Sequence, residues 1–181
     1  MKHTIIKTLL AILFLLPAWS FAQDKAIAKI FEEYSGKSGY TSVDISKGLF
    51  QLFAQLEADD PEFDDLQKAL EGLESLRLVA YSIEGDKGTT EEKNSFVSNI
   101  KSNVPFDEFK ELMVVRDGDD KINFYAKSEG QIITEMIMLV DGADKAVFLS
   151  LFGVIDLKHI AKLGSTMDLG GMEYLGKMKS E

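Results

Sequence analysis

The chain has 181 residues, 45% of them hydrophobic, with 30 acidic against 20 basic residues and a formal net charge of −10. This charge excludes nucleic acid as a partner, because phosphate backbones are bound by clustered Lys and Arg, and only Arg77 and Arg116 carry guanidinium groups. The chain contains no cysteine, which excludes disulfides, a lipoprotein anchor, a thiol nucleophile, Cys-ligated zinc and iron–sulfur clusters.

The first 22 residues have the three-part organisation of a secretory signal. Lys2 and Lys7 form a short basic region, residues 9–16 are an apolar run, and a small-residue site ends at Ala22. The run is far shorter than the roughly 20 residues needed to cross a bilayer. We therefore predict a Sec-type signal peptide over residues 1–22, cleaved near Ala22. The expected product is exported, periplasmic or secreted, is not a lipoprotein and has no transmembrane segment after cleavage.

Residues 23–181 are predicted to form one domain. Removal of the signal peptide from the 181 residues leaves 159, a length at which a single domain buries about 70% of its unfolded surface. No internal repeat, low-complexity linker or break in composition divides this stretch. Loss of Lys2 and Lys7 brings the net charge to about −12. Because there are no disulfides, the hydrophobic core alone must hold the fold.

The N-terminal half of this domain alternates between helical and extended patterns. Apolar residues at i, i+3, i+4 and i+7 indicate helices, whereas alternation with β-branched residues indicates strands. Pro61 after two aspartates is typical of a helix start, and Thr89 with Glu92 forms a capping box. The expected elements are a helix over 24–34, a strand over 40–46, helical spacing over 49–56, a helix from Pro61 with an apolar stripe ending at Leu73, a strand over 76–83 and a helix after Thr89.

The C-terminal half consists of apolar segments of about eight to ten residues separated by short turns, without room for helices between them. We expect strands at roughly 109–116, 121–127, 131–140 and 145–155, followed by a helical region that Asp156 caps. In the third strand Ile132 and Met136 share one face, while Ile133 and Ile137 share the other, so this strand should lie centrally. The predicted fold class is α+β, a single domain with an antiparallel β-meander sheet packed with several helices.

Few residues of this sequence suit catalysis. His159 is the one histidine left after signal cleavage, and a lone helical histidine is usually a surface or boundary residue. Ser46 and Lys47 are adjacent, unlike the S-x-x-K dyad, and Ser46 is better explained as a helix N-cap. Glu135 is the candidate catalytic residue, because it is the one acid on a strongly apolar strand and burial there would raise its pKa. Since Glu is seldom fully buried, a strand-edge or pocket-rim position is favoured.

Metal binding would have to use oxygen ligands, which makes calcium the ion to consider. The candidate ligands are Asp117, Asp119 and Asp120, but Glu129 stands at the thirteenth position of such a loop instead of the twelfth, and a hairpin turn explains the segment better. A second acidic group, made of Asp59, Asp60, Asp64 and Asp65, contains a helix cap. The methionines are placed for core packing and not for Cu(I). We therefore expect neither a metal nor a cofactor.

Two stretches carry a resemblance to a known family. They are Tyr40–Phe50, with its T-S-V-x-I-S-K phrase, and the meander from Ile122 through Glu135 to Leu157. Both resemble the bacterial exported family called domain of unknown function 4252 (DUF4252), over about residues 31–163. The resemblance implies a small cell-envelope protein of Gram-negative type, and the missing lipobox cysteine places it with the periplasmic relatives. It brings no activity and no catalytic residues.

Two classes of function remain open. The first is a non-enzymatic envelope protein that binds or scaffolds an unknown envelope protein or small ligand. The alternative is a carboxylate-based hydrolase that uses Glu135, or a calcium-dependent binder of glycans or peptides that uses the acidic turns. The sequence leaves the ligand, the oligomeric state and the strand order open.

Overall fold

The computed structural model describes residues 22–55, 61–83 and 88–156. They form helices and strands in the order α2 (Ala22–Tyr34), β1 (Tyr40–Ser46), α3 (Lys47–Ala54), α4 (Pro61–Glu71), β2 (Leu73–Ser82), α5 (Thr90–Asn103), the 3-10 helix η3 (Phe106–Glu108), β3 (Lys110–Asp117), β4 (Asp120–Glu129), β5 (Ile132–Asp141) and β6 (Lys145–Ile155). The predicted signal peptide, apart from Ala22 itself, and the last helical region with His159 lie outside the described residues.

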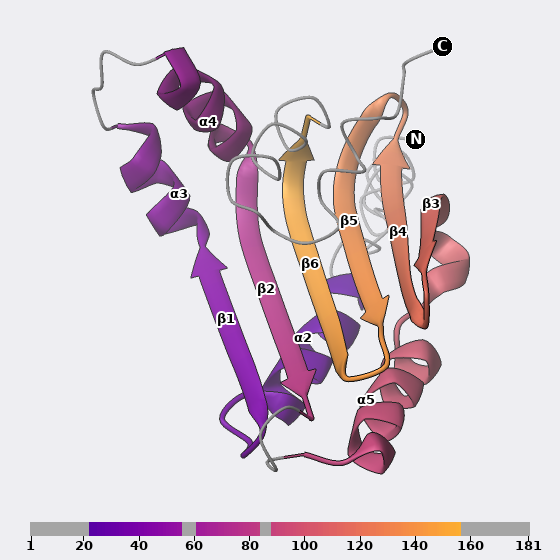
Figure 1. Ribbon diagram of the computed structural model, residues 1–181. Helices are drawn as coiled ribbons and strands as arrows, with labels where there is room; N and C mark the ends of the chain where they lie inside the picture. Colours follow the sequence, from indigo (N-terminus) through magenta and orange to yellow (C-terminus); the bar gives the residue numbers. More distant parts are fainter. Residues whose placement is uncertain (1–21, 56–60, 84–87, 157–181) are drawn as a thin grey trace, which may run out of the picture.

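The six strands form one sheet in the order β1-β2-β6-β5-β4-β3, and every neighbouring pair is antiparallel (Figure 1). The predicted meander is confirmed, because β3, β4, β5 and β6 pair consecutively. The central position expected for the third meander strand is confirmed too, since β5 lies between β6 and β4. The last strand, β6, lies between β5 and β2 and so joins the meander to the N-terminal pair of strands β1 and β2. The fold class is α+β, as predicted.

One face of the sheet is covered by α2 and α5, and α2 passes behind the strands in Figure 1. The predicted stripes of both helices are confirmed, because their apolar residues are buried against this face. The cluster joins helix residues Ile27, Ile30, Tyr34, Phe96, Val97, Ile100 and Val104 to strand residues Val79, Tyr81, Ile137, Leu139, Ala146 and Phe148. This first cluster is the main core of the described residues.

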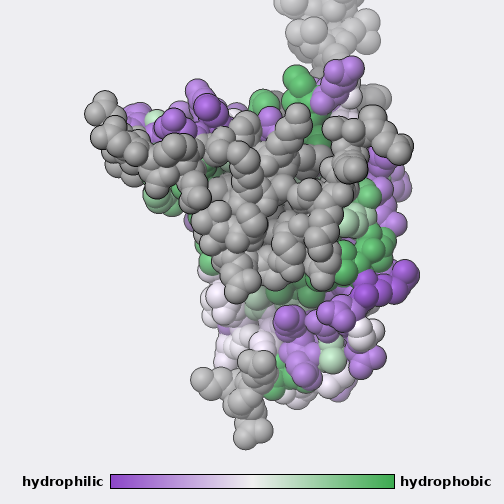
Figure 2. Space-filling view, turned by 45° about the horizontal axis from the view of Figure 1, so that its top comes forward, coloured by the Kyte–Doolittle hydropathy of each residue, from purple (hydrophilic) through white to green (hydrophobic). Residues whose placement is uncertain are grey.

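The opposite face of the sheet carries a second apolar cluster. Its buried members are Phe50, Leu73, Phe124, Met136, Met138, Val140, Leu149, Leu151 and Ile155. Helices α3 and α4, which stand at the upper end of β1 and β2 in Figure 1, contribute Phe50 and the half-buried Leu70. Hydrophobic residues reach the surface at several places in the space-filling view, among them its right side (Figure 2). The second face therefore keeps apolar residues near solvent.

Local sequence signals account for several element ends. The capping box at the start of α5 is confirmed, because the Glu92 amide donates to Thr89 Oγ1 over 3.1 Å and the Thr89 amide donates to Glu92 Oε2 over 3.2 Å. Ser46 is the N-cap of α3 as predicted, but its side chain makes no capping hydrogen bond. Leu73 begins β2 and is not the end of the α4 stripe. No helix within the described residues is long and apolar enough to span a bilayer.

A shift in register corrects the predicted faces of β5. The ladder between β4 and β5 is irregular where Lys127 pairs with Glu135 and Ser128 pairs with Ile133, so β5 holds one extra residue there. Ile133 consequently packs in the cluster that contains Met136, whereas the alternation of the sequence placed it with Ile137. A bulge inserts one residue into the alternation and moves the residues before it to the other face, so the simple period of two fails at this position.

Candidate functional site

Glu135, the candidate catalytic residue, lies on the central strand β5 with only 5% of its surface exposed. Of the two positions that the sequence favours, the strand edge is therefore wrong. Its ladder partners are Lys127 on β4 and Phe152 on β6. Hydrolysis by two carboxylates needs a second acid within about 5 to 10 Å, and the directly opposed positions on the two neighbouring strands do not supply one. Glu135 is a buried acid with its own interactions.

The candidate calcium ligands lie in the turn between β3 and β4, where Asp117 pairs with Asp120. The hairpin interpretation of this segment is confirmed. The Asp120 carboxylate accepts a hydrogen bond of 3.1 Å from the Ala143 amide and so connects this turn to the turn between β5 and β6. Asp117 and Asp119 are exposed. In the part of the chain that the structure describes, no group of three or more Asp, Glu, His or Cys residues is arranged to hold a metal ion.

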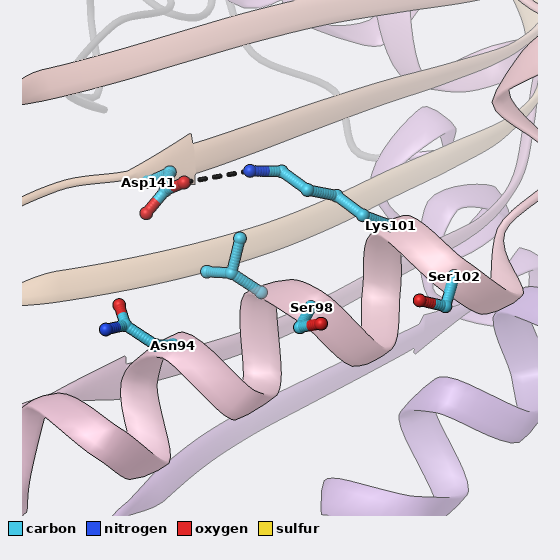
Figure 3. A pocket seen from close by; sticks show the side chains of 6 residues that line it. Asn94, Ser98, Lys101, Ser102 and Asp141 are labelled. Carbon is cyan, nitrogen blue, oxygen red and sulfur yellow. Dashed lines mark hydrogen bonds and ion pairs between the residues drawn. The ribbon is translucent and has the colours of Figure 1, made fainter.

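A polar pocket lies between α5 and the end of β5 (Figure 3). It is lined by Asn94, Val97, Ser98, Lys101, Ser102 and Asp141. The Lys101 ammonium lies 2.9 Å from a carboxylate oxygen of Asp141, as the dashed line in Figure 3 shows. Lys93, which α5 carries one residue before Asn94, is only 5% exposed, and its ammonium donates to the Gly142 carbonyl over 2.6 Å and to Asp141 over 3.5 Å.

The charged groups at this pocket form ion pairs with one another. Burial tends to raise the pKa of Asp141, but hydrogen bonds and charge attraction from Lys101 and Lys93 outweigh it and lower the pKa below its usual value. A general acid or base works best with a pKa near the ambient pH, and the pKa of this carboxyl moves in the opposite direction. The two lysines and Asp141 are therefore better understood as a connection between α5 and the β5–β6 turn than as catalytic groups.

Sequence reasoning missed Lys93, although a signal for its position exists. Lys93 stands three and four residues before Phe96 and Val97, so it belongs to the stripe of α5 that faces the sheet. A long side chain on such a stripe can bury its methylene groups while its ammonium reaches polar atoms at the edge of the core. The carbonyl oxygen of Gly142 is such an atom.

The tyrosines form a second buried polar group. The rings of Tyr34, Tyr40 and Phe96 lie 4.7 to 5.4 Å apart, and Tyr40 also stacks on Tyr81 at 4.7 Å. Burial and the neighbouring tyrosine and glutamate charges raise the pKa of Tyr40 to about 12. A phenol that stays protonated at neutral pH is a poor nucleophile or base, so we assign this group to packing.

Several apolar side chains are exposed and take no part in the two core clusters as buried residues. Among the described residues, the exposed large hydrophobic side chains are Val43, Leu49, Leu52, Phe53, Ile132, Phe152 and Val154. Val43 lies on β1, and Leu49, Leu52 and Phe53 lie on α3, which follows β1 without a gap. At about 100° per residue, the three α3 side chains fall within one arc of roughly 100°. We call Val43, these three residues and the free edge of β1 the β1–α3 surface.

The two edges of the sheet differ in how they are protected. Exposed edge strands invite pairing with other chains, and natural proteins prevent it with charges, Pro or bulges. The edge strand β3 has an irregular register between Glu111 and Met113 and four charged residues, Lys110, Glu111, Arg116 and Asp117. The edge strand β1 has a continuous register, no Pro or Lys, and Asp44 as its one charge. Of the two edge strands that the structure describes, β1 therefore has fewer features that oppose strand addition.

The β1–α3 surface is also electrically neutral. The Asp44 carboxylate lies 3.8 Å from Arg77 on β2, and the Lys47 ammonium lies 2.9 Å from Glu74. Each charge at the surface thus has a partner of opposite sign in the same chain.

The sequence contains a signal for this surface, namely more apolar residues in α3 than one helix face can bury, but helical spacing by itself does not reveal it. Residues 49, 50, 52 and 53 are all apolar, but one stripe of a short helix buries only some of them. In the structure Phe50 is buried and the other three are exposed. When the apolar residues of a short helix cover more than one face, we expect some of them to lie away from the core of the chain and to be available to a partner.

Comparison with known proteins identifies one family. Residues 34–163 match the family described as Domain of unknown function (DUF4252). This range covers most of the chain and includes β1, α3 and the whole meander. No curated protein and no solved structure matches the chain.

Proposed function

We propose that this chain, which belongs to the DUF4252 family, is an exported, non-enzymatic binding module of the bacterial cell envelope that holds a protein partner on its β1–α3 surface. The observation that carries the proposal is the combination of an unprotected edge strand with exposed Leu49, Leu52 and Phe53 on the adjoining helix. Partner proteins often bind by adding a strand to an open edge, and apolar side chains beside that edge then give specificity.

Export is supported by the N-terminal residues. Lys2 and Lys7 precede the apolar run over residues 9–16, and a small-residue site ends at Ala22. Export is tested by sequencing the N-terminus of the protein recovered from cells that express the full chain. We expect the recovered protein to begin at Gln23 and to fractionate outside the cytoplasm. A product that begins at Met1 and stays inside the cell contradicts this part of the proposal.

A binding role, in contrast to catalysis, is supported by the structural use of the polar groups. The Asp120 carboxylate holds a backbone amide and Asp141 holds two lysines. The ladder positions beside Glu135 carry a lysine and a phenylalanine. The exposed apolar side chains of α3, in contrast, would gain favourable free energy from contact with a partner, because burial of apolar surface contributes about 25 cal/mol per Å².

Site-specific photo-cross-linking in cells that export the protein tests the binding role. A benzophenone side chain placed at Leu52, which is 63% exposed, should form a covalent adduct with a protein on irradiation. The matched control places the same group at Val154, which is 60% exposed but lies at the end of β6. We expect an adduct from position 52 and none from position 154. An irradiated sample with no adduct at position 52 contradicts the proposal.

A further inference from the structure

We propose that the occupant of the β1–α3 surface is a second copy of this chain, and that β1 pairs with the partner's β1 in antiparallel orientation. The inference rests on the proposed function, because it names the partner of the same surface. It would join two six-stranded sheets into one continuous sheet around a twofold axis. Such an interface is self-complementary, which is the arrangement of most homodimers.

The sequence of β1 fits this pairing at every position. Val43 is the central residue of the 7 residues of Tyr40–Ser46, so full antiparallel overlap places it opposite the partner's Val43. Asp44 then lies opposite the partner's Ser42, and the two aspartates do not face each other. Directly opposed like charges destabilise a strand pair, whereas opposed β-branched side chains stabilise it. In this register β1 brings no like charges together.

The same pairing brings the partner's chain beside α3. Because α3 begins directly after Ser46, the antiparallel arrangement brings each α3 to the end of the partner's β1 where Tyr40 lies. Phe50 of α3 belongs to the second cluster, and Val43 lies on the same side of the sheet through its register with Leu78. The two Val43 side chains therefore meet at the centre of the joined sheet, while the two α3 helices lie at opposite ends of the interface, each beside the start of the partner's β1.

Charge favours a second copy at this place and at no other described edge. Two molecules of the exported protein, with a net charge of about −12 each once Lys2 and Lys7 are removed, repel each other, and they approach most easily through a neutral surface. Asp44 and Lys47 are each paired within the chain by Arg77 and Glu74. The β3 edge is unsuited, because its four charged residues and irregular register oppose regular pairing.

The surface is small, which sets the expected affinity. The 7 residues of β1 and the 8 of α3 are fewer than the roughly 20 to 30 residues that each partner contributes to a stable interface. We therefore expect a reversible dimer with a Kd of about 1 to 100 µM, in the range of weak complexes.

Sedimentation velocity of the purified, exported protein over a range of concentrations measures this equilibrium. Val43→Lys adds a charge that would face its own copy, and we expect it to raise the Kd at least about 10-fold. Leu52→Glu changes a side chain that is 63% exposed, so it leaves the fold intact and provides a second, independent test with the same expected direction. Val154→Lys is the matched control, since it adds the same charge away from β1 and should change the Kd less than about 2-fold.

The outcomes separate this inference from the proposed function. A dimer that Val43→Lys and Leu52→Glu weaken, with adducts of twice the chain mass from position 52, supports both. A protein that is monomeric at every concentration, but whose position 52 cross-links to a protein of another mass, overturns the second copy and preserves the binding surface. No dimer and no adduct overturns both. A dimer unaffected by either variant overturns the pairing through β1.

Discussion

The hydroxyl group of Tyr81 connects the strand β2 to the start of α5. It donates to Glu92 Oε2 over 2.6 Å and accepts from the Thr89 amide over 2.8 Å. The hydrogen bond from Tyr81, together with those from Thr89, lowers the pKa of Glu92. The capping box of α5 is thus tied to the core through a residue that is itself 2% exposed.

Replacement of Tyr81 by Phe should destabilise the protein, because it removes this connection and leaves the Thr89 amide with a weaker partner. We expect the Tm to fall by about 2 to 6 °C, the effect of one or two lost hydrogen bonds in a domain of this size. Differential scanning calorimetry measures the change. Tyr125→Phe is the control, since that tyrosine packs on Phe106 and its variant should melt within about 1 °C of the original protein.

Because of Asp141, the stability of the fold depends on pH in the acidic range. Its pKa is lower in the folded protein than the ordinary value of 3.8, so the stability it contributes is complete above about pH 5 and disappears as the pH falls through the folded pKa. Asp141→Asn removes the carboxylate near the buried ammonium of Lys93, which we expect to cost about 1 to 3 kcal/mol at pH 7.

Urea unfolding at a series of pH values measures this difference. The gap in unfolding free energy between the original protein and Asp141→Asn should shrink as the pH falls from about 5 to 2, because protonation removes the same charge. Asp117→Asn, at an exposed position of the β3–β4 turn, is the control for the loss of one carboxylate, and its free energy of unfolding at pH 7 should lie within about 0.5 kcal/mol of that of the original protein. A gap of constant size at every pH would contradict the assigned role of Asp141.

At the scale of elements, a close contact between two backbones fixes the ends of β2 and β6. The Val154 amide donates to the Gly72 carbonyl over 2.8 Å. Gly153 has a φ of +135°, and a Cβ at this position would collide with the Gly72 carbonyl oxygen and lie 2.8 Å from the Glu74 amide nitrogen. Only glycine allows both this dihedral angle and this approach.

Gly153→Ala should therefore destabilise the protein through both strain and collision. Gly130→Ala separates the two effects, because Gly130 has a φ of +65° with nothing within 4 Å of the added methyl group. We expect Gly130→Ala to cost about 1 to 2 kcal/mol, the price of a left-handed conformation alone. Gly153→Ala should cost at least about 2 kcal/mol more, measured by urea unfolding. Equal losses for the two variants would show that the contact with Gly72 is not tight.

The elements themselves were largely predictable from the sequence. Caps, turns and periodicity are local signals, and they located β1 to the residue and the meander strands to within about two residues. What they missed were non-local effects. The bulge beside Glu135 moves Ile133 to the other face, and the helical spacing over 49–56 does not reveal that Phe50 is the one buried residue of α3.

The candidate site was less predictable than the fold. Glu135 and the aspartates of the β3–β4 turn stood out because acids are the chemically reactive residues of this sequence, but the structure gives Asp120 a backbone partner. The β1–α3 surface depends on which strand is an edge, and strand order is a long-range property that periodicity does not encode. The sequence therefore shows which residues of the surface are apolar, but not that they lie at an edge of the sheet.

At the scale of the whole molecule, net charge controls association. Two copies of the exported protein, with a charge of about −12 each, repel through solvent, while the surface proposed to join them is neutral and apolar. Salt screens the repulsion and leaves apolar contacts intact. We expect the dimer Kd to fall about 2- to 5-fold between low salt and 0.3 M NaCl. Sedimentation velocity at both concentrations measures it, and a Kd that rises with salt would mean that ion pairs hold the copies together.

The place of β6 in the strand order has a consequence for how the polypeptide matures. Until Lys145–Ile155 arrives, the β1–β2 pair and the sheet of β3, β4 and β5 have no ladder to join them. The β2–β6 ladder joins residues from 63 apart (Ser82 and Lys145) to 80 apart (Leu73 and Gly153) in the sequence, and such long-range contacts form slowly. A polypeptide threaded through a translocation pore from its N-terminus would stay unfinished until its final strand had crossed, which keeps it competent for transport.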